Sequence, residues 1–586
     1  MNVVSRTRAD AQDIAAAWLT SFDEAVQAAD AAAAARLFAA DGHWRDVVAF
    51  TWRLQTESGA AAIAAALAPT LARTQATHFH IPTDRSPPRH VRRAGTECIE
   101  AIFEFDTKVG RANGVVRLVE EPDGAWRAWI LLTTLEELHG YPDGRPRAMS
   151  DAEKFSRDFG GENWLDQRRN AQAYDDHDPT VLVVGGGQAG LSVAARLGHL
   201  GVDTLIVDRN QRIGDNWRLR YHALTLHNEV HVNHLPLMPF PPTWPVFIPK
   251  DKLANWFETY VESLELNFWT GTELAGGSYD EKEKRWTVTL RRSDGSERTM
   301  RPRHIIVATG VSGIPVWPSV PGLDTFKGTV MHSGNYTQGA AWKGRKVLVI
   351  GTGNSGHDVA QDLCSSGADV TIVQRSPTYI VSIRQAQKVY ALYDEGLPFE
   401  DCDLLAAAMP YPVLKRAYQL STAEMREADR NLLKGLEDRG FRLAFGEDGT
   451  GFQMMYLRRG GGYYFNVGCS DMIVAGRIKL LQYDAIDRFV PEGVALRDGT
   501  VSPFELVVVA TGYESQQEFV RVTLGDEIAQ RVGPVWGFSE GGELRNMWTP
   551  NAQDGLWFTA GSLAQCRIFS RYLALQIKAR EDGLVG

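Results

Sequence analysis

Two glycine-rich segments of the same form are the residues in this chain best suited to hold a cofactor. They read Gly185-Gly186-Gly187-Gln188-Ala189-Gly190 and Gly351-Thr352-Gly353-Asn354-Ser355-Gly356. A loop of this kind lets the backbone approach a pyrophosphate closely and places that pyrophosphate on the N-terminus of a helix. Two such loops indicate two dinucleotides. In one chain this usually means a flavin and a nicotinamide, with a hydride passing between them.

Each loop needs a strand before it and a helix after it, and the flanking residues provide both. The short apolar runs 181–184 and 347–350 have the length of buried strands. Residues 191–200 and 358–363 then continue with the composition of helices. The alternative, two ordinary strand-to-helix turns, is disfavoured by the residues that follow each unit.

The residue after the next strand separates the two loops. Asp208 follows the apolar run 204–207, close to the ~20-residue spacing expected for an acid that holds ribose hydroxyls. After the second loop, the corresponding run 370–373 leads to Arg375 and Ser376, with no acid. Because an arginine there suits a 2′-phosphate, the second loop is predicted to prefer NADPH. A solvated Arg375 without a ligand is the alternative.

Four further motifs resemble those of the flavin-containing monooxygenase family, in the family's order. Phe326-Lys327-Gly328, His332-Ser333 and Tyr336 match its FxGxxxHSxxY fingerprint, of which Baeyer–Villiger monooxygenases carry a close variant. Ala510-Thr511-Gly512-Tyr513 resembles its ATGY segment, and Gly214-Asp215-Asn216-Trp217 resembles its flavin loop. Residues 235–242 resemble a loop of the auxin-forming plant members. The resemblance covers about residues 175–586.

This resemblance implies FAD at the first loop and NADPH at the second. In the family NADPH reduces FAD, O₂ then forms a flavin C4a-peroxide, and one oxygen atom passes to a small organic substrate, either a ketone or a soft heteroatom. Retained NADP⁺ shields that species, and residues 235–249 are a candidate for part of the shield. The predicted cofactor-binding residues are Gly185, Gly187, Gln188, Ala189, Gly190, Asp208, Arg209, Asn216 and Trp217 for FAD, and Gly351, Gly353, Asn354, Ser355, Gly356, Arg375, Ser376, His332, Thr511 and Gly512 for the rest of the cofactor site.

His227 and Asn228 are the candidate catalytic residues. Counting back from residue 235 places His227 where nitrogen- and sulfur-oxidising members of the family have asparagine. In this, and in its N-terminal extension, the chain resembles the type II members, which are associated with Baeyer–Villiger oxidation and with some use of NADH. The alternatives are that His227 only packs, and that the reaction is N- or S-oxygenation or an auxin-type decarboxylation of a 2-oxo acid. A module of another class would bind flavin and only reduce O₂ to peroxide.

A second interpretation of the histidines is a metal site. His227, His231 and His234 stand at i, i+4 and i+7, which would put them on one face of a helix. The prolines from Pro236 onward make a long helix unfavourable there. No metal is therefore predicted.

The N-terminal residues have a different texture from the rest. Trp18, Leu19, Phe22 and Val26 form an apolar stripe in the alanine-rich segment 11–40, which we expect to be one helix ended by Asp41-Gly42. A helix at 60–72 and strand-like segments follow, and the whole resembles a SnoaL-like cone with an antiparallel sheet. Trp44, Arg45 and Asp46 could line its pocket; a structural or dimerisation role is the alternative. The expected strands are 44–54, 97–106, 114–120 and 126–135.

Composition limits the remaining classes. The net charge of −10 leaves no basic surface for nucleic acid, and no apolar run reaches the ~18 residues of a membrane span. The five cysteines form no C-x-x-C pair, which argues against a dithiol reductase. We expect a cytoplasmic homodimer. Residues 401–443 should be helical, and Arg458–Tyr464 should be a hairpin turn rather than a phosphate loop.

The predicted fold class is α/β, with two Rossmann-type dinucleotide-binding domains preceded by an α+β SnoaL-like cone. The predicted boundaries are 1–145 for the cone, 146–178 for a linker, 179–335 for the first part of the FAD domain, 336–490 for the NADPH domain, and 491–586 for the second part of the FAD domain.

Overall fold

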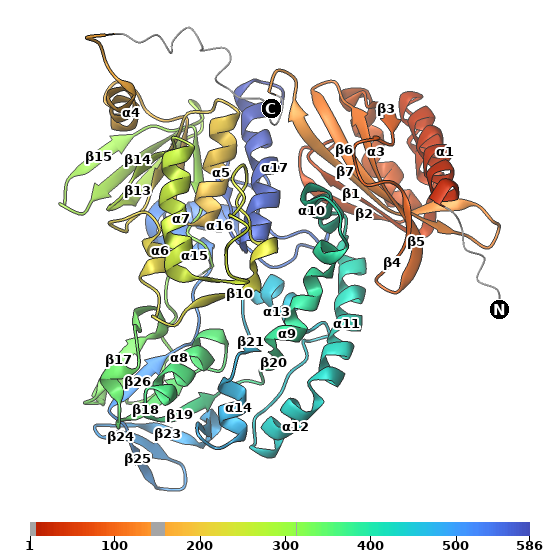
Figure 1. The fold of residues 1–586 in the computed structure, drawn as a ribbon. Helices are drawn as coiled ribbons and strands as arrows, with labels where there is room; N and C mark the ends of the chain where they lie inside the picture. Colours follow the sequence, from red (N-terminus) through yellow and green to blue (C-terminus); the bar gives the residue numbers. More distant parts are fainter. Residues whose placement is uncertain (1–7, 142–158, 312, 586) are drawn as a thin grey trace.

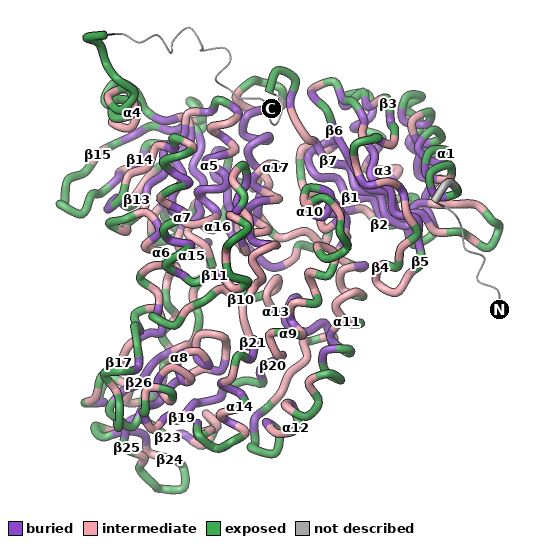
Figure 2. Tube along the Cα trace, in the orientation of Figure 1, coloured by how far each residue is buried: buried purple, intermediate pink, exposed green. Residues whose placement is uncertain are grey.

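The computed structural model describes residues 8–141, 159–311 and 313–585. Figure 1 shows three parts: an N-terminal α+β domain, a first Rossmann-type sheet beside it, and a second Rossmann-type sheet below. The predicted α/β class is thus confirmed. In Figure 2 the central strands of the two Rossmann-type sheets are buried, whereas many outer helix faces are exposed.

The first Rossmann-type sheet has five parallel strands in the order third, second, first, fourth, fifth along the chain. The helices α5 (Gln188–His199), α7 (Lys250–Ser263) and α17 (Leu563–Glu581) accompany it, and α5 packs against α17. A separate antiparallel sheet is formed by β13 (Thr272–Asp280), β14 (Arg285–Arg292) and β15 (Glu297–Met300). The five strands are β12 (Asn267–Trp269), β9 (Thr204–Val207), β8 (Val181–Val184), β16 (His304–Val307) and β27 (Leu556–Phe558).

The second Rossmann-type sheet repeats this design. Its parallel strands are, in order, β17 (Thr329–His332), β26 (Leu506–Val509), β18 (Lys346–Ile350), β19 (Asp369–Gln374) and β22 (Lys479–Gln482). β17 and β26 lie outside residues 336–490, so we extend the proposed NADPH domain to about 329–509. This range includes α8 (Asn354–Ser365) and the antiparallel strands β23 (Ile486–Val490), β24 (Gly493–Leu496) and β25 (Val501–Pro503).

A mostly helical insertion follows β19. The hairpin expected at Arg458–Tyr464 is wrong: Gly460 ends a helix in the left-handed conformation, and the next strand, β21, pairs in parallel with β20. The elements of the insertion are β20 (Tyr379–Ser382), α9 (Ile383–Ala386), η6 (Gln387–Asp394), α10 (Phe399–Ala407), α11 (Tyr411–Ala428), α12 (Arg430–Asp438), α13 (Gly451–Arg459), β21 (Tyr463–Asn466) and α14 (Cys469–Val474).

In the N-terminal domain the single helix expected at 11–40 is wrong. The chain forms α1 (Arg8–Gln27) and α2 (Ala31–Arg36) instead, because Asp30 caps a new helix by accepting a hydrogen bond from the backbone N–H of Ala33. Asp41-Gly42 ends no helix but lies inside β1 (Phe38–Val47). A third helix, α3 (Ala60–Thr74), completes the helical layer.

The N-terminal sheet is mixed rather than antiparallel, because β1 runs parallel to β7. The strand expected at 44–54 is also wrong: β1 ends at Val47, and a turn with positive φ at Val48 and Trp52 leads into β2. Strands β2, β3 and β4 were not predicted. The remaining strands are β2 (Leu54–Ser58), β3 (Thr77–His80), β4 (Arg89–Arg93), β5 (Thr96–Asp106), β6 (Gly110–Glu120) and β7 (Trp126–Leu138).

Trp44, Arg45 and Asp46 do not line one pocket. The Trp44 ring packs inside the domain against Phe50, and the Asp46 carboxylate accepts hydrogen bonds from Thr51, Thr133 and the Phe50 N–H. Arg45 points to the opposite face of the sheet, because side chains alternate along a strand. There it pairs with Glu543 of the C-terminal part of the chain, at 2.6 Å.

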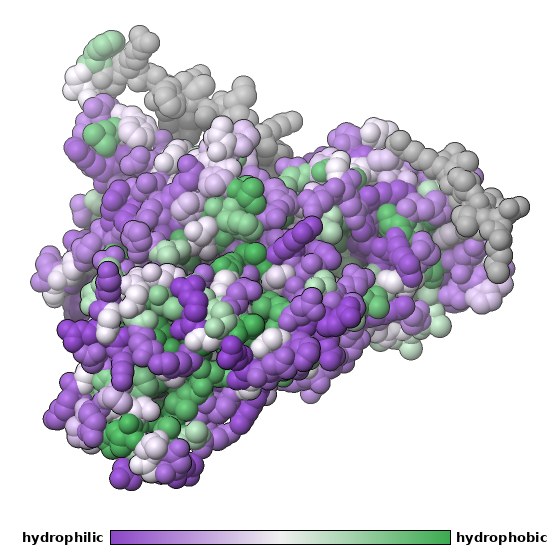
Figure 3. All heavy atoms as spheres, turned by 60° about the horizontal axis from the view of Figure 1, so that its bottom comes forward, coloured by the Kyte–Doolittle hydropathy of each residue, from purple (hydrophilic) through white to green (hydrophobic). Residues whose placement is uncertain are grey.

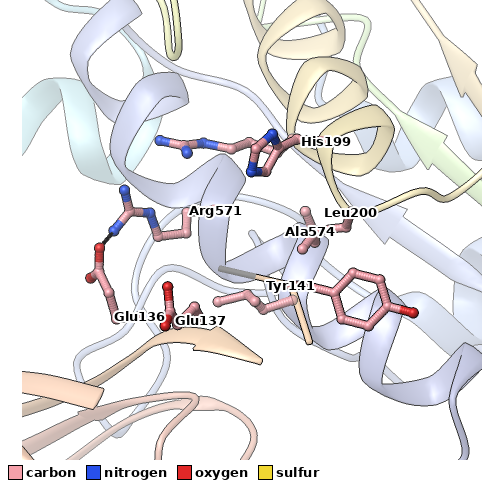
Figure 4. A pocket seen from close by; sticks show the side chains of 9 residues that line it. Glu136, Glu137, Tyr141, His199, Leu200, Arg571 and Ala574 are labelled. Atoms are coloured by element: carbon pink, nitrogen blue, oxygen red, sulfur yellow. Dashed lines mark hydrogen bonds and ion pairs between the residues drawn. The ribbon is translucent and has the colours of Figure 1, made fainter. Parts of the chain in front are cut away.

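The outer face of the N-terminal sheet rests on other parts of the same chain. Trp129 and Ile130 of β7 pack with Val413 of α11. Figure 4 shows Arg571 of α17 paired with Glu136 of β7 across the seam between the two parts. This outer face of the N-terminal sheet is therefore covered in part within the chain.

The predicted linker is described only from residue 159, and residues 146–158 lie outside the described residues. Within the described part, α4 (Trp164–Ala173) begins with a capping box formed by Asn163 and Asp166. Trp164 donates a hydrogen bond from Nε1 to Glu265, 2.6 Å away, but its ring is exposed. Among the described residues, no helix combines the length and apolarity that a membrane crossing needs.

Candidate functional site

The two glycine loops have the same local geometry at the same place in their sheets. The first glycines have left-handed backbone, with φ of 112° at Gly185 and 117° at Gly351. A Cβ at Gly185 would lie 2.6 Å from the carbonyl oxygen of Ala308, and one at Gly351 would lie 2.3 Å from that of Ala510. Each alanine directly follows a strand that pairs with the loop's own strand, β16 beside β8 or β26 beside β18. Both loops therefore lie where the strand order reverses, the usual ligand position in such sheets.

The third glycine of each loop is required by packing. A Cβ at Gly190 would lie 2.0 Å from the carbonyl oxygen of Gly185, and a Cβ at Gly356 would lie 2.0 Å from that of Gly351. Neither contact can be relieved without moving backbone. These glycines let the helix approach its strand closely.

The middle glycine is not required by the fold. Gly187 and Gly353 have φ of −82° and −81°, which any residue can adopt. A Cβ at Gly353 would meet nothing closer than 3.9 Å, and one at Gly187 would meet only the side-chain amide of Asn216. Glycine at these two positions leaves space in front of a helix N-terminus, as a bound pyrophosphate needs.

The residues predicted around the first loop are brought together. The Asp208 carboxylate accepts a hydrogen bond from the Gly186 N–H at 2.7 Å. Trp217 donates from Nε1 to Gln188 at 3.3 Å, and Gln188 donates to the carbonyl of Gly561 at 3.2 Å. α6 (Asp215–Arg218) carries Trp217, together with the Asn216 that faces Gly187. Ala189 is buried on α5, whereas Arg209 is exposed and remains only a predicted contact.

Around the second loop, Asn354 accepts a hydrogen bond from the Phe465 N–H at 3.0 Å. This bond ties the N-terminus of α8 to β21 of the insertion. Arg375 and Ser376 follow β19 and are exposed, and Ser355 is half-buried on α8. Their roles toward a nicotinamide dinucleotide stay predictions.

His227 and Asn228 lie on β10 (Thr225–Glu229), which pairs with β11 (Phe247–Pro249). The His227 ring packs against Phe465, with 4.6 Å between ring centroids. Because the Phe465 backbone is bonded to Asn354, only this one residue separates His227 from the second glycine loop. Asn228 makes a side-chain hydrogen bond with Tyr390 of η6, and burial raises the pKa of Tyr390 to about 12.

His227 is neutral at neutral pH. Neighbouring protein atoms desolvate the ring and lower its pKa to about 4. The residue is also partly exposed to solvent. A neutral imidazole can donate one N–H and accept one hydrogen bond.

The alternative metal interpretation has no support in the described part of the chain. No three His, Cys, Asp or Glu side chains there are placed to share a metal ion. His234 instead accepts a hydrogen bond at Nδ1 from the Phe240 N–H, 2.9 Å away. His231 lies 3.4 Å from Glu229.

His332, Thr511 and Gly512 meet where the chain crosses between the two Rossmann-type sheets. The His332 ring is buried, which lowers its pKa, and it packs against Tyr513 at 5.0 Å. Thr511 donates from Oγ1 to the carbonyl of Val316 at 2.6 Å. These contacts join the two crossing segments beside Ala510, the residue that touches Gly351.

The neighbours of the candidate catalytic residues were not predicted. Gln387 donates from Nε2 to the carbonyl of His227 at 2.7 Å, across 160 residues of sequence. Tyr390 and Phe465 also belong to the insertion. None of the three stands in a motif, and only the fold brings them to β10. Figure 3 shows the face of the molecule that comes into view when the bottom of Figure 1 is turned forward. Apolar residues gather there in a band, with polar residues on both sides.

Comparison with known proteins agrees with this arrangement. Residues 182–392 match the family model described as pyridine nucleotide-disulphide oxidoreductase. All five cysteines are free, however, so no redox disulfide is present. The structure is similar to epsilon-caprolactone-bound cyclohexanone monooxygenase, with a TM-score of 0.51, 19% identity, and coverage of 70% of this chain and 89% of that one. It is also similar to OTEMO in complex with FAD and NADP, with a TM-score of 0.50, 15% identity, and coverage of 70% and 86%.

Relatives in sequence identify the family more specifically. The chain is 30% identical over 338 residues to indole-3-pyruvate monooxygenase YUCCA1 of Oryza sativa subsp. japonica, covering 58% of this chain and 77% of the relative. It is 29% identical over 349 residues to indole-3-pyruvate monooxygenase YUCCA4 of the same plant, covering 58% and 74%. With the two matching glycine loops and the crossing that joins them, these relatives show that the chain is an enzyme that belongs to the flavin-containing monooxygenase family.

Proposed function

We propose that this enzyme uses NADPH and FAD to transfer one oxygen atom from O₂ to a small organic substrate. The reaction that we propose is the Baeyer–Villiger oxidation of a ketone. The observation that carries the proposal is the pair of glycine loops, whose middle glycines leave space that the fold itself does not require. Asp208 would hold the ribose of FAD, and Arg375 the 2′-phosphate of NADPH. NADPH is the expected donor, with NADH possible.

When bound, FAD would supply the redox chemistry with O₂, and the protein would orient the reactants and exclude water. His227 would donate a hydrogen bond from its neutral ring to the oxygen that attacks the substrate. A ketone carbon is electrophilic and must be attacked by a negatively charged oxygen, which such a donor stabilises. A sulfide instead attacks a neutral oxygen donor, so its oxidation should depend less on the hydrogen bond from His227.

A second candidate reaction is the oxidative decarboxylation of a 2-oxo acid. The relatives named indole-3-pyruvate monooxygenase favour it, because indole-3-pyruvate is such an acid. A panel containing a cyclic ketone, a thioether and an aromatic 2-oxo acid separates these reactions by the product formed per NADPH consumed. Product from the ketone alone supports the first reaction. Peroxide without product from all three would support an uncoupled oxidase.

The His227→Phe variant tests the role of the imidazole, because it keeps a ring against Phe465 and removes the N–H donor. We expect the ratio of lactone to sulfoxide to fall by about tenfold, the effect of one hydrogen bond to a charged group of ~1.5 kcal/mol. His227→Asn retains a hydrogen-bond donor, so its ratio of lactone to sulfoxide should lie between those of His227→Phe and the wild type. An unchanged ratio, measured by gas chromatography at equal NADPH consumption, would assign His227 to packing alone.

The Arg375→Ala variant tests the nicotinamide site. Loss of a charge-assisted hydrogen bond to the 2′-phosphate should raise KM for NADPH by about 10- to 100-fold, since such bonds contribute roughly 1.5–3 kcal/mol. The KM for NADH should hardly change, because NADH has no phosphate there. Equal changes for both cofactors would refute the assignment; Arg345→Ala, which alters an exposed pair with Glu505, is the control.

We further propose that the enzyme works in the cytoplasm as a homodimer. The covered part of the outer face of the N-terminal sheet is not available for a subunit contact. Light scattering of the purified chain gives the number of subunits, and a monomeric mass would contradict this part of the proposal.

A further inference from the structure

Arg567 of α17 is buried and joins two segments that are far apart in sequence. Only 5% of its surface is exposed. Its Nε and Nη2 atoms donate to the two carboxylate oxygens of Asp403, both at 2.8 Å. Its Nη1 atom donates to the carbonyls of Val232 and His234, at 3.0 and 2.9 Å. Such a two-pronged pair has a fixed geometry, because the guanidinium fork and the carboxylate are both planar.

The carbonyls held by Arg567 belong to the segment that follows the candidate catalytic residues. Asn233, 1% exposed, lies between them and donates from Nδ2 to the carbonyls of Asn228 and Glu229, at 2.9 and 3.0 Å. The end of β10 is thus bonded to Asn233. The two residues on either side of Asn233, Val232 and His234, are bonded to Arg567. A shift of Arg567 would be transmitted to the backbone beside His227.

Asp403 is held in turn by its own surroundings. It lies on α10 and accepts a hydrogen bond from the Tyr393 hydroxyl at 2.7 Å. The ring of Phe399, also on α10, lies 4.3 Å from the guanidinium carbon of Arg567. The position of Arg567 therefore depends on the position of α10.

The other side of α10 is bound by the N-terminal domain. Asp401, 1% exposed, accepts hydrogen bonds from Arg85 at 2.5 Å and from the Ser86 N–H at 2.8 Å. The last carbonyls of the helix accept from two further arginines of that domain. Arg45 donates to the carbonyl of Ala407 at 2.5 Å, and Arg117 donates to those of Leu405, at 3.1 Å, and Ala408. Figure 1 shows α10 between the N-terminal sheet and the rest of the enzyme.

We propose that the N-terminal domain positions the candidate catalytic strand β10 through α10 and the Asp403–Arg567 pair. Asp403, Arg567 and Arg117 are positioning residues, since they act through backbone carbonyls and through α10. The domain is then a working part of the oxygenation site rather than an assembly module. This inference rests on the proposed function only where it names β10 as catalytic.

The test has a readout that needs no substrate. Amide hydrogen exchange, followed by mass spectrometry on the full-length protein as purified, compares wild type with Asp403→Asn and Arg117→Met. Asparagine keeps the shape of Asp403 but loses its charge. In Arg117→Met, the buried Glu100 keeps its pairs with Arg89 and Arg93. Peptides within residues 227–239 should exchange roughly tenfold faster or more in both variants, the opening expected when a charge-assisted bond is lost.

Peptides from β18 and β19 should keep their wild-type exchange rates, which separates this effect from general unfolding. The matched control is Glu427→Gln, which neutralises a carboxylate in the exposed pair with Arg430. If Asp403→Asn fails to fold, Arg117→Met decides, because it leaves the Asp403–Arg567 pair intact. Unchanged exchange at 227–239 in a folded variant would overturn the proposal.

Activity adds a second readout. With a substrate that the wild type oxygenates, both variants should send a larger share of the NADPH to hydrogen peroxide, with KM for NADPH unchanged. Misplacement of about 1 Å can lower product formation by up to ~100-fold. If the wild type oxygenates no substrate, the proposed function fails, while the exchange result still decides whether the N-terminal domain positions β10.

Discussion

Replacing Gly187 by tryptophan is expected to give a folded but colourless protein that has no NADPH-dependent activity. The φ of Gly187 is one that any residue can adopt, and a Cβ there meets only the side-chain amide of Asn216. An indole can therefore be accommodated by the fold, but it fills the mouth of the loop at the N-terminus of α5. FAD binding should be lost, because the pyrophosphate cannot reach the backbone N–H groups that would hold it.

The absorption spectrum of the purified variant, together with its thermal unfolding, checks this result. Gly198→Trp is the matched control: Gly198 lies on the same helix, and a Cβ there meets nothing within 4 Å. That control should remain yellow. Flavin bands of wild-type intensity in Gly187→Trp would show that the first loop does not hold FAD.

The corresponding change in the second loop, Gly353→Trp, should separate the two cofactors. This variant is expected to bind FAD normally and to lose reduction by NADPH by more than about 100-fold. The loss of two hydrogen bonds to a charged pyrophosphate, at ~1.5 kcal/mol each, already accounts for that factor. A Cβ at Gly353 meets nothing closer than 3.9 Å, so the substitution should act on the ligand and not on the fold.

Anaerobic stopped-flow spectroscopy measures the rate of flavin reduction in this variant. Dithionite should still reduce the flavin at the wild-type rate, because it needs no dinucleotide site. Reduction by NADPH at an unchanged rate would show that the second loop is not the nicotinamide site. Gly187→Trp and Gly353→Trp also serve as controls for each other, since each should spare the other cofactor.

The Rossmann-type units could be predicted from sequence because close approach of backbone to backbone restricts what residues fit. At Gly190 and Gly356 a side chain would collide with the backbone carbonyl of the first glycine of the same loop, Gly185 or Gly351. This constraint is local, so it appears as a motif with fixed spacing. The same holds for Asp208, which bonds to the loop backbone at Gly186.

The errors arose where a single local contact or a distant partner decided the structure. Asp30 divides the alanine-rich segment by capping a second helix, although composition alone favours one continuous helix. The strand after Gly460, β21, does not form a hairpin. It pairs with β20, where Tyr463 lies opposite Tyr379. A hydrophobic pattern indicates which face of a strand is buried, but it does not identify the strand that it pairs with.

The surroundings of His227 could not be predicted for the same reason. Gln387, Tyr390 and Phe465 reach β10 from the helical insertion, and Arg567 reaches the next turn from α17. Each is an ordinary polar or aromatic residue in its own segment. Their importance follows from the fold, which brings three distant segments to β10 and the turn after it.

The most direct test of the proposed function is a reaction under dioxygen labelled with oxygen-18 at both atoms. A cyclic ketone, NADPH and the purified yellow enzyme are combined, and the product is analysed by mass spectrometry. We expect a lactone that carries one heavy oxygen atom, formed in equal amount to the NADPH consumed. NADPH consumption that yields only hydrogen peroxide, with no labelled product from the ketone, the thioether or the 2-oxo acid, would contradict the proposal that this chain is an oxygen-transferring enzyme.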